Sequence, residues 1–168
     1  MLIHASRRAA AAALLALAAS PAWADAPAPA AHRLGTDVVP VSQSVHLVAD
    51  ARKADYTGTV RIELDVRRPA ATFALHAEQM DIRRVALSGA GGAVTAAAPL
   101  PRGRYVLEID FANEFDTRAS GLYKVAAAGD DYLFTQFEAD EARQAFPCWD
   151  EPSFKIPYQM TVVVPEAH

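Results

Sequence analysis

Apolar and charged residues alternate along several short stretches of the chain, and this pattern limits the possible fold more than any other feature. In residues 59–67, the apolar Val60, Ile62, Leu64 and Val66 are separated by charged side chains. Successive side chains of a strand point to opposite faces, so the alternation predicts a strand with one buried and one wet face. The same pattern predicts further strands at residues 45–48, 72–76, 82–87, 105–111 and 154–164.

Turn-forming residues separate these stretches. They lie at residues 55–58, 68–69, 89–92 and 99–103. Short alternating strands with turns at regular spacing are typical of an all-β sandwich. Residues 140–145 form the one stretch with a helical pattern, and it is scarcely longer than one turn. The pattern therefore predicts a mainly antiparallel all-β domain and carries no information on chemistry.

Composition excludes several classes of protein. The 168 residues suit one domain, and 16 basic against 20 acidic residues leave a formal net charge of −4. No basic excess is available to neutralise phosphates, so we expect no nucleic-acid partner. No apolar run reaches the roughly 18 residues of a transmembrane span. A single cysteine, Cys148, excludes an intrachain disulfide, and no two of the five histidines lie within five positions of each other. We therefore expect no metal site in this chain.

The first residues predict a targeting signal. Arg7 and Arg8 precede an apolar stretch at 9–19, and Ala22-Trp23-Ala24 forms an A-x-A cleavage site. Residues 1–24 are therefore interpreted as a signal peptide cleaved after Ala24, which predicts a secreted or periplasmic protein; an alanine-rich helix of the mature protein is the alternative. Residues 25–32 are expected to form a flexible leader rich in alanine and proline. Residues 33–168 are expected to form the folded domain.

Residues 132–165 contain a specific combination of motifs. They are TQFE at 135–138, AR at 142–143, AFPC at 145–148, DEP at 150–152 and FK at 154–155. In this order and spacing they closely resemble the segment that marks the N-terminal domain of aminopeptidase N-like zinc metallopeptidases, relatives of leukotriene-A hydrolase. Weaker matches occur at 33–34, 39–40, 58–62, 75–77 and 121–123, so the resemblance covers roughly residues 33–165.

The resemblance implies a saddle-like antiparallel β-sandwich that packs on a thermolysin-like catalytic domain. Family members bind one zinc ion through an H-E-x-x-H motif and a more distant glutamate. Neither that motif nor the family's G-x-M-E-N loop occurs in the 168 residues. We therefore expect a fragment that is incomplete at the C-terminal end of the domain, holds no catalytic residue or zinc ligand, and has no peptidase activity alone.

Glu138 and Gln136 are the candidate substrate-binding residues. In the family, the glutamate of TQFE accepts hydrogen bonds from the free α-amino group of the peptide substrate, and the resemblance implies this role for Glu138. The alternative is an ordinary exposed acid in a solvated turn with Asp140 and Glu141. Gln136 lies two residues earlier, on the same side of an extended backbone, where it could contact the first substrate side chain.

The other polar residues of the motif segment are interpreted as structural. Arg143 is expected to pair with Asp150 or Glu151, and a paired-carboxylate acid–base function of those two acids is the weaker alternative. Cys148 lies in an apolar setting and is expected to be a buried small hydrophobe. His76 follows an apolar stretch and is expected to be a structural histidine.

Two hypotheses of function follow. The first is the N-terminal part of a secreted zinc aminopeptidase that removes N-terminal residues from peptides. The second is a stand-alone secreted β-sandwich that binds a partner without catalysis. An H-E-x-x-H motif encoded after His168 would decide for the first, and a true stop codon would favour the second.

Overall fold

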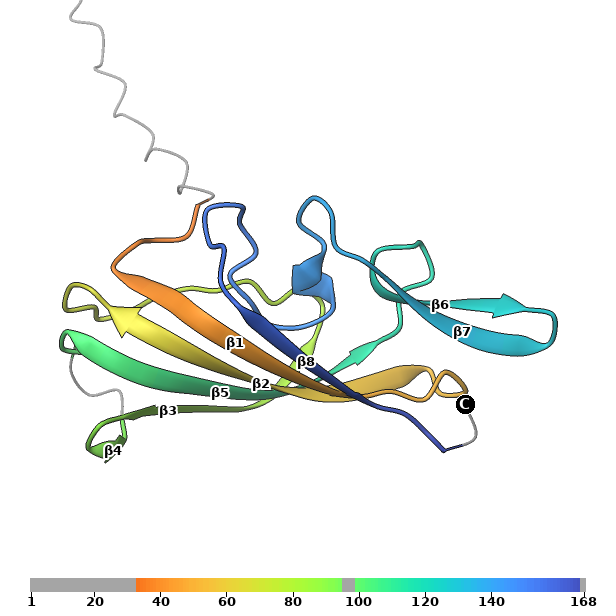
Figure 1. Ribbon diagram of the computed structural model, residues 1–168, viewed down its shortest axis with the longest axis horizontal. Coiled ribbons are helices and arrows are strands. Elements are labelled where there is room, and N and C mark those ends of the chain that lie inside the picture. The colour runs from red at the N-terminus through yellow and green to blue at the C-terminus, as the bar shows by residue number, and fades with distance from the viewer. Residues whose placement is uncertain (1–32, 95–98, 167–168) are drawn as a thin grey trace, which may run out of the picture. The chain divides into compact units, whose positions relative to one another are not determined.

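The computed structural model describes residues 33–94 and 99–166, and these residues form two β-sheets (Figure 1). The large sheet has six strands in the order β4-β3-β5-β2-β1-β8, and the small sheet is the hairpin β6-β7. The predicted all-β fold is confirmed. The strands are β1 (Val38–Val48), β2 (Asp55–Val66), β3 (Asp81–Gly89), β4 (Gly92–Ala93), β5 (Gly103–Glu114), β6 (Gly121–Ala127), β7 (Asp130–Gln136) and β8 (Tyr158–Val163).

β2 shows how the alternation of the sequence is used. Val60, Ile62 and Leu64 are fully buried, whereas Arg61 and Glu63 between them are exposed. We call the face of the large sheet that carries the three apolar residues the inner face. The strand therefore has the buried and wet faces that its sequence predicts.

Cross-strand neighbours form continuous apolar rows on the inner face. One row runs from Val85 in β3 through Ile109, Val60 and Val45 to Met160 in β8. The three central residues are at most 4% exposed, whereas Val85 and Met160 are 59% and 44% exposed. The core therefore lies over β5, β2 and β1, and it ends before β3 on one side and β8 on the other.

The segment that carries the family motifs covers this core. Phe146, Cys148 and Trp149 are buried, and the Trp149 ring stacks on Phe73 at 6.1 Å between centroids. Nε2 of Gln43, an inner-face residue of β1, donates to a carbonyl of the same segment. Figure 1 shows the short 3-10 helix η1 (Ala142–Gln144) and its adjoining loops on one side of the large sheet.

β8 and residues 72–76 differ from the sequence-based expectation. β8 pairs with β1 in parallel, and it begins at Tyr158 rather than at residue 154. Alternation shows which side chains share a face but not the direction of the neighbouring strand. Residues 72–76 do not form a strand; His76 makes an isolated antiparallel bridge with Cys148, and this bridge ties the stretch to the covering segment.

Residues 55–58 are predicted as a turn but lie inside β2. Gly58 is needed there for packing rather than for turning. A Cβ atom on Gly58 would lie 2.6 Å from the Phe111 ring and 2.9 Å from the His46 carbonyl oxygen. The glycine therefore leaves room for a buried aromatic ring of the neighbouring strand.

The hairpin β6-β7 is absent from the strands predicted by alternation. Its β6 strand ends in alanines and its β7 strand begins with two aspartates, so neither end shows an apolar–polar alternation. Tyr123 of β6 and Phe134 of β7 are cross-strand neighbours whose rings stack at 5.7 Å. Cross-strand aromatic pairs of this kind stabilise two-stranded sheets.

Candidate functional site

The TQFE segment leaves the small sheet and turns toward the core. Gln136 is the last residue of β7, and Phe137 follows it. The Phe137 ring makes an edge-to-face contact with the buried Phe146 at 5.7 Å and 85°. Phe137 thus points into the protein, whereas Gln136 and Glu138 on either side of it are exposed.

The Gln136 side chain lies against the backbone of Glu138. The backbone N–H of Glu138 donates to Oε1 of Gln136 at 3.3 Å. Among the described residues, no hydrogen bond or ion pair occupies the Glu138 carboxylate. Its oxygens are therefore available to accept hydrogen bonds from another molecule, and the Nε2 group of Gln136 is available to donate one.

Glu138 begins a tight turn that ends at Glu141. The Glu138–Ala139 peptide bond is cis, and the N–H of Glu141 donates to the Phe137 carbonyl at 3.0 Å. Asp140 is exposed at the tip of the turn. Glu141 is half-buried, and its Oε2 accepts a hydrogen bond from Nε2 of Gln144 at 3.2 Å. The interpretation of this stretch as a solvated turn therefore holds for Asp140 but is wrong for Glu141.

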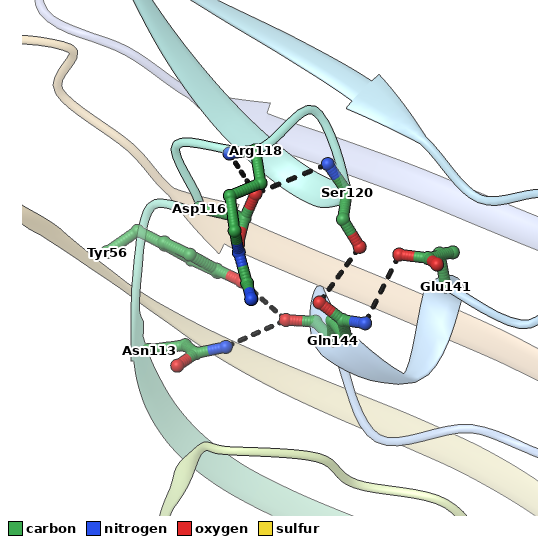
Figure 2. Close-up of polar contacts among 7 residues, drawn as sticks. All are labelled: Tyr56, Asn113, Asp116, Arg118, Ser120, Glu141 and Gln144. Carbon is green, nitrogen blue, oxygen red and sulfur yellow. Dashed lines mark hydrogen bonds and ion pairs between the residues drawn. The ribbon is translucent and has the colours of Figure 1, made fainter.

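Gln144 joins this turn to two other parts of the chain (Figure 2). Its backbone carbonyl accepts from Nδ2 of Asn113 at 2.7 Å and, more weakly, from the Tyr56 hydroxyl at 3.4 Å. Its Oε1 accepts from the Ser120 hydroxyl at 2.9 Å. Burial raises the pKa of Tyr56, so its hydroxyl stays a donor. The sequence does not reveal this network, because no motif or spacing marks its members.

A polar hollow of about 590 Å³ opens beside this network at the end of β5. Its lining includes both acidic and basic side chains. They come from β2, β3, β5 and the loop after β5, and include Asp55, Asp81, Arg83, Asn113, Glu114 and Arg118.

Arg143 and Asp150 form the structural pair that the sequence predicts. The backbone N–H and Nε of Arg143 both donate to Oδ2 of Asp150 at 3.0 Å, and Nη2 donates to the Asp150 carbonyl at 2.7 Å. The Glu151 carboxylate accepts instead from the backbone N–H of Leu34. The two acids hold separate parts of the backbone, so they are not arranged as a paired-carboxylate acid–base site.

Cys148 is buried in the segment that covers the core. Burial is the main cause that raises the pKa of the Cys148 thiol, so this residue packs as a small hydrophobe, as predicted. In residues 33–94 and 99–166, no three His, Cys, Asp or Glu side chains converge as metal ligands would. These described residues therefore do not supply the ligand set of the zinc ion that the resemblance implies for the family. The described part of the chain also has no helix long and apolar enough to cross a membrane.

Comparison with known protein families decides the relationship. Residues 39–168 match the peptidase M1 N-terminal domain. The chain belongs to the peptidase M1 family. The resemblance carried by the motif segment is therefore confirmed.

Curated relatives of the chain are named aminopeptidases. Aminopeptidase M1-C of Oryza sativa subsp. japonica is 31% identical, over 84% of this chain and 19% of the relative. Aminopeptidase N of Acetobacter pasteurianus is 30% identical, over 82% of this chain and 43% of the relative. Endoplasmic reticulum aminopeptidase 1 of Homo sapiens is 29% identical, over 77% of this chain and 16% of the relative. The chain thus spans less than half the length of each of these M1 family relatives.

Proposed function

We propose that this chain is the N-terminal domain of an aminopeptidase and that Glu138 binds the free α-ammonium group of the peptide substrate. The observation that carries the proposal is the arrangement around Phe137. Packing of Phe137 on Phe146 holds the segment in the protein, while Gln136 and Glu138 on either side of it stay exposed. An exposed carboxylate with no hydrogen-bond or ion-pair partner among the described residues, next to an amide donor, suits the N-terminus of a peptide.

The chemistry of Glu138 explains selectivity for peptide ends. A carboxylate accepts charge-assisted hydrogen bonds from an ammonium group, and an internal peptide bond offers no such group. The Oε1 atom of Gln136 already accepts from the Glu138 backbone, so its Nε2 group is left to contact the first substrate residue. In this proposal, the domain selects and orients the substrate and moves no proton.

The catalytic step is assigned to a separate domain. We infer that the zinc ion and its ligands belong to a thermolysin-like catalytic domain on which this domain packs, so the 168-residue chain alone is inactive. We also propose that residues 1–24, which lie outside the described residues, direct the protein to secretion or to the periplasm, with cleavage after Ala24. The sequence encoded after His168 tests the first point, because an in-frame H-E-x-x-H motif is expected there.

The role of Glu138 is tested in the full-length enzyme. Glu138→Gln keeps the shape and removes the charge, and a hydrogen bond to a charged group contributes on the order of 1.5–3 kcal/mol. We expect kcat/KM to fall roughly 10- to 150-fold for all substrates with a free α-amino group. The control is Glu63→Gln in the wet face of β2, where the half-exposed side chain accepts from the exposed Arg61 side chain at 3.4 Å. Near-wild-type kinetics of both variants would refute the assignment of Glu138.

A further inference from the structure

The peptide unit that joins Phe137 to Glu138 is held from both sides. Its N–H donates to Oε1 of Gln136 at 3.3 Å, and its carbonyl accepts from the N–H of Glu141 at 3.0 Å. The Glu138 side chain is attached directly to this peptide unit. The N–H of Glu141 therefore helps to hold the backbone from which the Glu138 side chain projects.

Glu141 is in turn held by Gln144. The Gln144 side chain donates from Nε2 to the Glu141 carboxylate at 3.2 Å, and the Gln144 backbone N–H donates to the Glu141 carbonyl at 3.1 Å. The other end of the Gln144 amide accepts from the Ser120 hydroxyl at 2.9 Å. Ser120 is itself fixed, because its backbone N–H donates to Oδ1 of Asp116 at 3.3 Å (Figure 2).

Gln144 also lies against the small sheet at the level of Gln136. Gly121 is the cross-strand partner of Gln136. A Cβ atom on Gly121 would lie 2.9 Å from Cβ of Gln144, and the φ angle of Gly121 is +61°. Both the close approach and the left-handed backbone require glycine. Gln144 therefore contacts the strand pair that carries Gln136 and the turn that carries Glu138.

We propose that Gln144 is a positioning residue that sets the direction of the Glu138 carboxylate, acting through Glu141. This inference rests on the proposed function of Glu138. The contacts require an amide, because one end of the side chain must donate to a carboxylate and the other must accept from a hydroxyl. A glutamate at 144 would place a second carboxylate against Glu141, and a leucine would make neither hydrogen bond.

A double-mutant cycle in the full-length enzyme tests the inference, with the variants Gln144→Leu, Glu138→Gln and their combination. Loss of the hydrogen bonds in Gln144→Leu is expected to lower kcat/KM for free-amino peptides about 3- to 10-fold, mainly through a higher KM. In the Glu138→Gln background, the same substitution is expected to lower kcat/KM less than about 2-fold, because there is no carboxylate left to orient. This coupling is what a merely structural role would not produce.

Ser120→Ala is the second variant, for the case in which Gln144→Leu does not fold. It keeps Gln144 and removes only the hydroxyl that holds its Oε1. We expect a smaller loss of kcat/KM that likewise disappears in the Glu138→Gln background. Equal losses in both backgrounds, or no loss in either, would overturn the positioning role while leaving Glu138 in place. A Glu138→Gln enzyme with normal kinetics would overturn the proposed function itself, and the positioning role with it.

Discussion

The backbone N–H of Asp150 donates a hydrogen bond to Nδ1 of His76 across 3.2 Å. Nδ1 can accept this bond only when it carries no proton. Next to it, His76 and Cys148 exchange two backbone hydrogen bonds of 2.9 Å each. His76 therefore helps to hold the segment that covers the core and carries the candidate site, which confirms its predicted structural role.

Stability is predicted to fall as the pH drops below about 6.5. Burial, and after it the positive charge of Arg143, lower the pKa of His76 in the folded protein. The unfolded chain has the ordinary histidine value of about 6.5, so below that pH the unfolded state binds more protons than the folded state. The stabilisation that comes from a neutral His76 is fully present above about pH 6.5. It is lost as the pH falls toward the pKa of His76 in the folded protein. Chemical denaturation at a series of pH values measures it.

His76→Asn is the matched variant for this effect. Asparagine keeps a side-chain oxygen that can accept from Asp150 but has no proton to titrate. Its free energy of unfolding is expected to change less between pH 7 and pH 5 than that of the wild-type chain. Parallel pH profiles of the two proteins would show that His76 is not the titrating group.

Gly58→Ala is predicted to destabilise the domain by overpacking. The added Cβ would lie 2.6 Å from the buried Phe111 ring and 2.9 Å from backbone, and neither can move freely. Such overpacking typically costs about 1–3 kcal/mol of unfolding free energy. Gly35→Ala is the control, because its added Cβ would have no atom within 4 Å. Equal thermal midpoints for the two variants would contradict this account of Gly58.

Among the described residues no strand pairs with the outer edge of β8, and this edge predicts that the 168-residue chain associates with itself. Tyr158, Met160 and Val162 continue the inner-face rows but are 43%, 44% and 54% exposed. β8 contains no charged residue, and long apolar edges without charges favour pairing between chains. Sedimentation velocity is expected to show larger species as the concentration rises.

Val162→Lys is expected to reduce this association, because a charged side chain on an edge strand opposes pairing. Val85→Lys is the matched control, since Val85 ends a row at the opposite side of the sheet. If the wild-type chain remains monomeric at all concentrations, or if the two lysine variants behave alike, β8 is not the associating edge.

The sequence by itself determined which faces of the main strands are buried. Alternation in β2 and β5 identifies their inner-face residues. Successive side chains of a strand point to opposite faces, and the hydrophobic effect favours burial of the face that carries the apolar side chains. The motif segment similarly identified the family and singled out Gln136 and Glu138. Alternation could not show that β8 runs parallel to β1, or that Gly58 leaves room for Phe111, because both depend on neighbours that are distant in the chain.

Only the tertiary structure decided how the site is held. Gln144 is bonded to Ser120 and Asn113, which are 24 and 31 positions away along the chain. Such contacts leave no periodic or local signal in the sequence, because they depend on how the β5–β6 connection and η1 meet on the inner face. Glu141 illustrates the result: among the acids at 138, 140 and 141, the sequence does not distinguish the exposed ones from the one bonded to Gln144, and the fold does.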